Sequence, residues 1–477
     1  MQPLNELSLT EARAALDNGT ITSEQLTKDC VTKAKGLNGS LNALIELYET
    51  EALTQARDAD ERRKQGNSAG VLDGIPLVLK DNILNQGHVV SAGSKMLANH
   101  ISASDATVTH KLKNQGAIIL GRANMDEFAM GSSNERSAYG PTRHPRDPER
   151  VPGGSSGGSA VAVAADFTIA ALGSDTGGSI RQPAAFCGIV GFKPTFGRVS
   201  RSGLIAMASS LDQIGPMTKT VKDAAILFDA IQGPDVLDQT TAKTTPFIAA
   251  WKKDLKGVRI GLPRQAWGEG MQPGVRTRVT EAIDVLKNLG AEIIEIDLPY
   301  VEEALAVYYV LMPCEVSANL SRLDGMRYGL RLENLPLFET YAQSRAAGFG
   351  PEVKRRILLG TYALSRGYYE AYYLQAKKVQ TLIRKAYVKA FETVDVLLTP
   401  TAPTTAFKIG EKTADPLTMY LEDIFTVGVN VAGLPAISVP CGNSPDNGLP
   451  VGLHLTARAF DEANLLAIAD CYEMASK

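Results

Sequence analysis

Residues 168–181 read Thr168-Ile-Ala-Ala-Leu-Gly-Ser-Asp-Thr-Gly-Gly-Ser-Ile-Arg181. This stretch indicates both the kind of fold and the place of a functional site. Its first five residues predict a buried β-strand. The strand passes directly into a loop with two glycines and a serine. Few large side chains in such a loop would block a substrate. We therefore expect a functional site at the end of a buried strand.

Short apolar runs of this kind alternate with helical stretches along much of the sequence. Seven more segments predict buried strands, namely residues 75–79, 117–120, 258–262, 292–296, 396–399, 437–440 and 451–456. Amphipathic helices lie between several of them, as at Gly274–Leu289. The alternation predicts an α/β fold, an α/β/α sandwich around a mixed and mostly buried β-sheet.

Helical segments are expected at the start of the chain and again beyond its middle. Residues 8–11 and 22–25 both fit the capping box, in which side chains satisfy the free amides of a first helical turn. We expect an N-terminal helical segment over 1–66 and a helical cap or side layer over roughly 300–391. The sequence shows no internal repeat, so one domain over 1–477 is expected.

Composition excludes several classes of protein. With Lys+Arg 49 and Asp+Glu 52, the net charge of −3 gives no general basic field for nucleic acid. The five cysteines are scattered and never form C-x-x-C, which favours a reducing compartment and a cytoplasmic location. Residues 1–22 lack the apolar region of a secretory signal, and the most apolar stretch, 159–173, is too short to cross a bilayer. We expect no membrane partner.

A lysine stands at the end of another predicted strand, in Gly74-Ile-Pro-Leu-Val-Leu-Lys80-Asp81-Asn82. At the edge of an apolar run an amine is desolvated, which lowers its pKa and can leave it able to accept a proton. The alternative is a lysine that reaches solvent or pairs with Asp81. For an isolated lysine at a strand end, this alternative is the more common one.

Glycine is concentrated around two serine-containing loops, Gly153-Gly-Ser-Ser-Gly-Gly-Ser159 and the loop of residues 175–181. The 63 residues of 153–215 include 12 glycines, a density that indicates close approach or unusual dihedral angles. A flexible linker is the alternative, but the apolar flanks of both loops argue against it.

Four consecutive residues in the second loop have the composition of an anion-binding turn. The amides of Thr176, Gly177 and Gly178, just before Ser179, could point into one concavity. Donors in this arrangement would stabilise the negative charge of a tetrahedral intermediate, so an oxyanion hole is expected here.

Other catalytic patterns are excluded because the sequence lacks residues that they require. Gly153-x-Ser155-x-Gly157 matches a nucleophile elbow, which needs a later histidine. Only His454 follows, and we interpret it as structural. The phosphate-loop spacing at 116–123 lacks the lysine and the hydroxyl, and the histidines show no metal-ligand spacing, so no metal is expected. A pairing of serine with lysine remains.

These residues resemble the amidase signature family. The resemblance rests on Lys80 in Lys-Asp-Asn, on the first serine loop, and on Asp175-Thr-Gly-Gly-Ser-Ile-Arg-Gln-Pro-Ala-Ala-Phe-Cys-Gly188. It implies that Ser179 is the acyl-accepting nucleophile and that Lys80 is the base. Ser155, expected after a cis peptide bond, would relay the proton. The amides of residues 176–179 would form the oxyanion hole.

Further motifs narrow the resemblance to family members that serve tRNA-dependent amidotransferases. They lie at residues 124–135, 192–200, 209–216, 321–329, 352–356 and 415–420. The resemblance implies three ligands for glutamine: Tyr308 as a wall and hydroxyl, Arg356 for the α-carboxylate and Asp423 for the α-ammonium. Without the resemblance, each of these three residues is equally well interpreted as part of a routine surface contact. Ser174 departs from the family pattern, where threonine is expected, and we expect it to have no catalytic role.

The resemblance implies a glutaminase that forms an acyl-serine and frees ammonia. A partner subunit would use the ammonia, with ATP and Mg²⁺, to convert Glu-tRNA(Gln) to Gln-tRNA(Gln). The complex would be a heterotrimer in which this chain is joined by the B and C subunits, and no cofactor would bind to this chain. The alternatives are a stand-alone amidase for another small amide, and an RNA-binding or scaffold subunit with vestigial serines. Asp-tRNA(Asn) as a further acceptor, and asparagine as donor, stay open.

Basic residues and tyrosines interleave between Glu352 and Glu392. An RNA-contacting face is one interpretation. The other is a solvated helix face with the tyrosines packed on the opposite side, and this is the one that we expect. The tyrosines concerned are Tyr368, Tyr369, Tyr372, Tyr373 and Tyr387.

Overall fold

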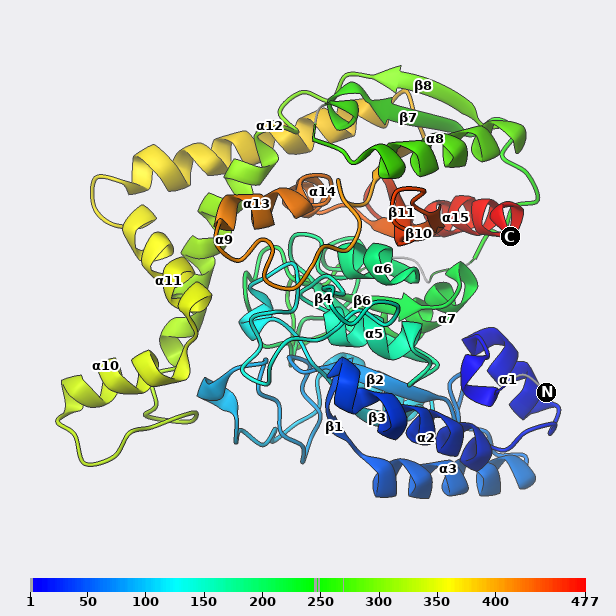
Figure 1. Ribbon diagram of the computed structural model, residues 1–477, viewed down its shortest axis with the longest axis horizontal. Coiled ribbons are helices and arrows are strands. Elements are labelled where there is room, and N and C mark those ends of the chain that lie inside the picture. The colour runs from blue at the N-terminus through cyan, green and yellow to red at the C-terminus, as the bar shows by residue number, and fades with distance from the viewer. Residues whose placement is uncertain (1–2, 244–246, 248, 269) are drawn as a thin grey trace.

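The centre of the computed structural model is a mixed β-sheet (Figure 1). The structure describes residues 3–243, 247, 249–268 and 270–477. Within them, eleven strands follow the order β1-β3-β2-β4-β6-β5-β10-β11-β9-β7-β8. Their bounds are β1 (Leu44–Leu47), β2 (Pro76–Lys80), β3 (Ile118–Ala123), β4 (Ala170–Asp175), β5 (Val190–Lys193), β6 (Gln213–Thr218), β7 (Arg259–Pro263), β8 (Glu292–Ile296), β9 (Val396–Pro400), β10 (Ala436–Asn443) and β11 (Pro450–Ala457). The expected fold class, a mixed sheet with helices, is confirmed.

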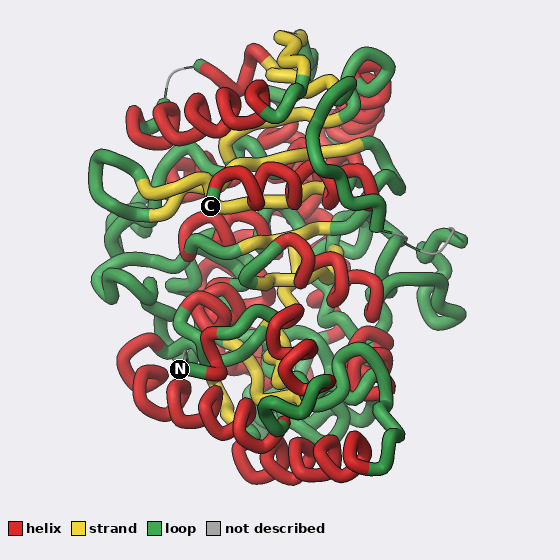
Figure 2. The backbone as a smooth tube through the Cα atoms, turned by 90° about the vertical axis from the view of Figure 1, so that its right-hand side faces the viewer, coloured by secondary structure: helices red, strands yellow, loops and turns green. Residues whose placement is uncertain are grey.

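Helices pack on both sides of the strands (Figure 2). The bounds are α1 (Leu9–Asp17), α2 (Ser23–Leu41), α3 (Glu49–Lys64), α4 (Thr107–Asn114), α5 (Gly157–Ala164), α6 (Arg181–Cys187), α7 (Val221–Ile231), α8 (Pro273–Asn288), α9 (Ala304–Asn319), α10 (Leu337–Gly348), α11 (Pro351–Ala363), α12 (Gln375–Ala390), α13 (Pro416–Tyr420), α14 (Val427–Ala432) and α15 (Glu462–Ser476). Ser8 and Thr22 cap α1 and α2, and both capping boxes are complete, as predicted.

The sheet consists of two sequence halves that meet at one strand pair. Strands β1 to β6 form one side and β7 to β11 the other, and β5 pairs with β10 in an antiparallel register. All eight predicted strands are present. Strands β1, β5 and β6 were not predicted, because β1 and β5 have four residues each and β6 contains a glycine and a proline. The prediction that Glu292–Ile296 is buried is wrong, since β8 is an edge strand that alternates between exposed and half-buried residues.

Helices α9 to α12 extend to one side of the sheet, on the left of Figure 1. Between α11 and α12, residues Tyr369–Leu374 form a π-helical turn without buried side chains. The expectation that the tyrosines pack inside holds for Tyr387, which is buried. It is wrong for Tyr368 and Tyr372, which are 41% and 43% exposed and stack on one another with ring centroids 5.9 Å apart.

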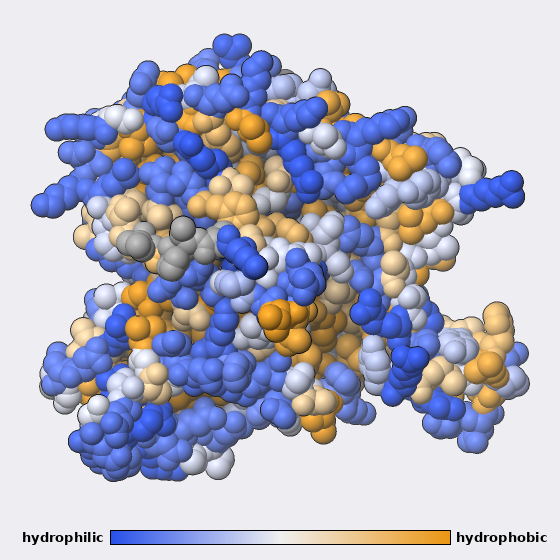
Figure 3. All heavy atoms as spheres, turned by 180° about the vertical axis from the view of Figure 1, so that it is seen from behind, coloured by the Kyte–Doolittle hydropathy of each residue, from blue (hydrophilic) through white to orange (hydrophobic). Residues whose placement is uncertain are grey.

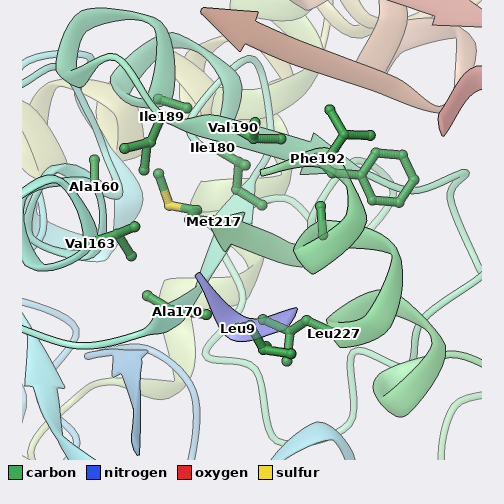
Figure 4. Packing of buried hydrophobic residues seen from close by; sticks show 14 of the residues in the cluster. Leu9, Ala160, Val163, Ala170, Ile180, Ile189, Val190, Phe192, Met217 and Leu227 are labelled. Carbon is green, nitrogen blue, oxygen red and sulfur yellow. The ribbon is translucent and has the colours of Figure 1, made fainter. Parts of the chain in front are cut away.

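The hydrophobic core anchors the loop that carries the candidate nucleophile. Ile180 is fully buried, and Figure 4 shows it beside Met217 of β6, with Ala160 and Val163 of α5 across the cluster. A Cβ built on Gly173 of β4 would lie 2.9 Å from Cγ1 of Ile180, so the side chain covers β4 closely. The packing of Ile180 therefore fixes the position of its neighbour, Ser179.

Hydrophilic side chains dominate the face seen in Figure 3, and the hydrophobic ones form scattered patches there. Among the described residues, no helix combines the length and the apolar character that a membrane crossing requires. All five cysteines are described; each is buried, and none forms a disulfide.

Candidate active site

Two parallel neighbours in the sheet bring the candidate base to the site. Strands β2 and β4 pair with Leu79 opposite Leu172, so both strands end at the same edge. Lys80 is the last residue of β2 and is fully buried. Its Nζ lies 2.8 Å from Oγ of Ser155, and 3.0 Å and 3.2 Å from Oγ and the carbonyl oxygen of Ser174.

Burial makes this lysine a base at neutral pH. Desolvation lowers the pKa of Lys80 from 10.5 to about 7, against the opposing charges of Asp126, Asp175 and Asp212. The alternative that Lys80 reaches solvent or pairs with Asp81 is wrong. The Asp81 carboxylate instead accepts hydrogen bonds from Arg122, Ser91 and the amide of Gly93.

The first serine loop is pressed against the segment that follows β3. The peptide bond between Gly154 and Ser155 is cis, as expected. A Cβ on Gly154 would lie 2.2 Å from Oδ2 of Asp126, which explains the glycine at this position. The amide of Gly154 donates to Oε1 of Gln182 at 2.9 Å. The close approach predicted from glycine density is confirmed here.

The second serine loop meets the first at the backbone. The amide of Ser156 donates to the carbonyl oxygen of Ser179 at 3.1 Å. Ser179 is 8% exposed, whereas Ser155 is fully buried. The structure thus brings Lys80, Ser155 and Ser179 together from three separate segments, with the lysine beside Ser155 and Ser179 on the accessible side.

The amides before Ser179 are not all free. The N–H of Gly178 donates to Oδ1 of Asp175 at 2.9 Å. The N–H groups of Gly177 and Ser179 have no acceptor in the part of the chain that the structure describes. Gly178 has a φ of +146°, and a Cβ there would lie 2.3 Å from Oγ1 of Thr426. Only glycine fits this turn, which holds the two free amides next to the nucleophile.

A buried ion pair flanks the turn that holds Gly177 and Gly178. Asp175 and Arg181 are fully buried and lie 3.0 Å apart, and Asn430 donates a further hydrogen bond to Asp175 at 2.8 Å. Burial alone would raise the pKa of Asp175, but Arg181 holds it well below its usual range. The sequence alone suggested no role for this pair, although both residues flank the glycines of the motif.

His454 lies behind Arg181 and contacts neither serine. Its Nε2 is 3.0 Å from a guanidinium nitrogen of Arg181, and its Nδ1 is 3.0 Å from Oγ1 of Thr399. Burial and the arginine lower its pKa well below the ordinary value, so the ring is neutral. This geometry confirms the structural interpretation and excludes the nucleophile-elbow mechanism.

Tyr308 and Asp423 lie over the glycines of the nucleophile loop. A Cβ on Gly177 would be 2.9 Å from the hydroxyl of Tyr308, which belongs to α9. A Cβ on Gly178 would be 3.2 Å from Oδ1 of Asp423, the last residue of a 3₁₀ helix at Leu421–Asp423. Both side chains are buried, so they cover the glycines that precede Ser179.

The carboxylate of Asp423 has one oxygen in use and one without a partner. Ser132 donates to Oδ2 at 2.5 Å, whereas the buried Oδ1 accepts no hydrogen bond in the described structure. Burial raises the pKa of Asp423 to about 8, and the Ser132 hydrogen bond opposes that rise. An unsatisfied buried acceptor of this kind suits a cationic donor on a ligand.

Arg356 of α11 belongs to the same electrostatic environment. It is 3% exposed, and its charge lowers the pKa of Asp423 and of Tyr308 against the larger effect of burial. The three residues expected to bind glutamine are therefore close enough to influence one another, although Tyr308 and Asp423 are 115 positions apart in the sequence.

Four residues contact the site although no part in it was assigned to them from the sequence. Ser174 accepts hydrogen bonds from Lys80 at both its hydroxyl and its carbonyl oxygen, and the expectation that it has no catalytic role stays a prediction. The amide of Asn82 donates to the same hydroxyl at 2.9 Å. Ser132 and Gln182 were not singled out either. For Ser174 the available signal was its place in a buried strand, one residue before the Asp-Thr-Gly-Gly-Ser motif.

No group of three or more His, Cys, Asp or Glu side chains is placed to hold a metal ion within the described ranges. The site instead offers a neutral amine on the hydroxyl of Ser155, and opposite charges on Arg356 and Asp423.

Comparisons with known proteins cover nearly the whole chain. A model of the amidase family matches residues 25–466. The A subunit of the glutamyl-tRNA(Gln) amidotransferase of Chloroflexus aurantiacus is 53% identical over 475 residues, covering 99% of this chain and 97% of its own. The crystal structure of the corresponding A subunit from Thermotoga maritima is 43% identical with a TM-score of 0.82, covering 98% of this chain and 94% of its own. The peptide amidase from Stenotrophomonas maltophilia is 32% identical with a TM-score of 0.83, covering 99% and 98%.

Proposed function

The chain belongs to the amidase family, and from that premise we propose that it is the glutamine-hydrolysing A subunit of a glutamyl-tRNA(Gln) amidotransferase. The observation that carries the proposal is the buried carboxylate of Asp423 over the nucleophile loop: its Oδ1 has no partner in the described structure, and the charge of Arg356 acts on it. An α-amino acid offers an ammonium and a carboxylate to match them. Identity of 53% over 475 residues to a protein of that name supports the same assignment.

The chemistry follows from the proton path. Neutral Lys80 takes the proton of Ser155, and Ser155 takes that of Ser179, whose Oγ attacks the side-chain amide carbon of glutamine. Of the oxyanion hole expected at Thr176, Gly177 and Gly178, the N–H of Gly178 is engaged by Asp175. The free N–H groups of Gly177 and Ser179 stabilise the oxyanion instead.

The tetrahedral intermediate then collapses. The C–N bond breaks, the proton returns through Ser155 to the leaving nitrogen, and ammonia departs from a γ-glutamyl ester on Ser179. Water, activated by the same base, hydrolyses the ester to glutamate and restores the hydroxyl of Ser179.

The rest of the proposal concerns the complex. The ammonia passes to a partner subunit, which activates the glutamate of Glu-tRNA(Gln) with ATP and Mg²⁺. The B and C subunits complete a cytoplasmic heterotrimer, and this chain, folded as one domain over residues 1–477, supplies only the glutaminase. A stand-alone amidase is the alternative, and it has less support because the peptide amidase is only 32% identical.

Ammonia release from L-glutamine tests the proposal. The chain is purified with its native partners, Ser179→Ala serves as the blank, and Glu-tRNA(Gln), Asp-tRNA(Asn) and ATP are added or withheld. We expect release that vanishes in the variant and rises with tRNA and ATP. Release that ignores both additions and needs no partner would instead establish a free-standing amidase.

A further inference from the structure

Four donors from three parts of the chain converge on one buried carboxylate. Glu352, in the first turn of α11, is 3% exposed. Its Oε1 accepts from Nε of Arg356 and from the hydroxyl of Tyr420, each at 2.9 Å. Its Oε2 accepts from Arg136 at 2.7 Å and from Arg355. The cluster joins α11 to α13 and to the segment after β3.

Two aromatic rings hold the guanidinium of Arg356 in place. Its central carbon lies 5.5 Å and 5.6 Å from the ring centroids of Tyr309 and Tyr420. The two rings stack on one another, 3.8 Å apart and 21° from parallel. Burial, stacking and the ion pair with Glu352 together leave Arg356 little freedom to rotate.

The contact with Glu352 decides which edge of the guanidinium is free. Nε is engaged by Glu352, while Nη1 has only the weak acceptor Sδ of Met312, at 3.6 Å. Nη2 of Arg356 donates no hydrogen bond to any of the described residues. The paired Nη1 and Nη2 atoms therefore form the available fork, which matches the two oxygens of a carboxylate.

We infer that Glu352 is a positioning residue for substrate recognition, which turns the Nη edge of Arg356 toward the α-carboxylate of glutamine. The inference rests on the proposed function and adds a specific role for a residue that does not touch the substrate. Glu352 acts through Arg356 alone, so its loss lowers the affinity for ligands with a carboxylate and leaves the chemistry at Ser179 intact.

The test uses the purified complex and the substitution Glu352→Gln, which keeps the shape of the side chain and removes its charge. Glu462→Gln is the matched control. Glu462 is also buried, but it accepts from the amide of Thr195 on another part of the fold. Tyr420→Phe, which removes one donor to Glu352 and keeps the ring, is the milder companion variant.

Two measurements separate recognition from chemistry. The first is the kcat and KM for L-glutamine. The second is the rate at which phenylmethanesulfonyl fluoride inactivates Ser179, with and without protection by L-glutamate. The reagent has no carboxylate, so its rate reports Lys80, Ser155 and Ser179 without Arg356.

For Glu352→Gln we expect KM to rise about 10- to 100-fold, the scale of a lost charge-assisted hydrogen bond. Protection by glutamate should weaken in parallel, with kcat and the inactivation rate within about threefold of the wild type. Tyr420→Phe should raise KM by about threefold and Glu462→Gln should change neither constant.

An unchanged KM in Glu352→Gln, or an equal loss of kcat and of the inactivation rate, would overturn the inference. The second outcome would mean that Glu352 supports the fold generally. If the wild-type complex releases no ammonia from glutamine, the proposed function fails and the inference fails with it. The wild-type measurement alone identifies that case.

Discussion

The proton acceptor in this site predicts how the reaction depends on pH. With a pKa of about 7, half of the Lys80 amines are neutral at pH 7. At the ordinary value of 10.5 only about one in 3,000 would be neutral. Burial of Lys80 at the end of β2 therefore raises the fraction of neutral, reactive amine at pH 7 by roughly three orders of magnitude.

The sign of the effect follows from which form reacts. Only the neutral amine accepts the proton of Ser155, so kcat should level off above about pH 8, be half-maximal near pH 7 and fall further below it. About a tenth of the maximal kcat should remain at pH 6 and about a hundredth at pH 5. The assay is ammonia release at saturating glutamine from pH 5 to 9, with stability at each pH checked by returning samples to pH 8.

Asp423 supplies a second and separable effect of pH. Its pKa of about 8 means that the carboxyl group is mostly protonated in the free site at pH 7, and a ligand ammonium binds the ionised form. KM should therefore rise as the pH falls through about 8. Asp423→Asn should raise KM about 10- to 100-fold and remove its pH dependence, while the decline in kcat near pH 7 stays.

Two results would refute this account of Lys80. A kcat that stays constant down to pH 5 would show that no group with a pKa near 7 is the base. A kcat that climbs steadily to pH 9 would show that Lys80 keeps the ordinary pKa of a lysine in spite of its burial.

Four further substitutions test the site. Ser179→Ala and Ser155→Ala should each lower ammonia release by about 10⁴-fold or more, measured on the complex, and substantial residual turnover would remove that serine from the mechanism. Lys80→Met should abolish activity yet raise the free energy of unfolding by about 1–3 kcal/mol, because it removes a buried amine; a urea titration that shows destabilisation would contradict this. Gly178→Ala should cost about 1–3 kcal/mol in the same titration and most of the activity, since its Cβ would meet Thr426 at a φ of +146°; wild-type behaviour would show that the turn tolerates a side chain.

Residues whose chemistry is local in sequence were predictable. Lys80 ends an apolar run and Ser179 follows two glycines, so each signal lies within ten residues of its own position. Eight strands were equally visible as apolar runs. Strand β6 was not, because its Gln213-Ile-Gly-Pro-Met-Thr218 sequence has no strand pattern and depends on pairing with β4 and β5.

Roles that depend on distant partners could not be predicted from the sequence alone. Glu352 is held by hydrogen bonds from Arg136 and Tyr420, which are 216 and 68 residues away. Asp423 is marked by a missing hydrogen bond, which is a property of packing. The resemblance to the amidase signature family supplied Tyr308, Arg356 and Asp423 as candidates, but no single-sequence pattern indicated how they are held.

The pairing of β5 with β10 has a consequence for how the chain is made. Lys193 of β5 pairs with Ala436 of β10, which the ribosome adds 243 residues later. Throughout that interval one edge of β5 is unpaired, and an unpaired edge can join with other chains. The nascent protein thus carries both candidate serines, Ser155 and Ser179, on an incomplete sheet until its last strands emerge. Folding helpers that shield strand edges should matter most during that interval.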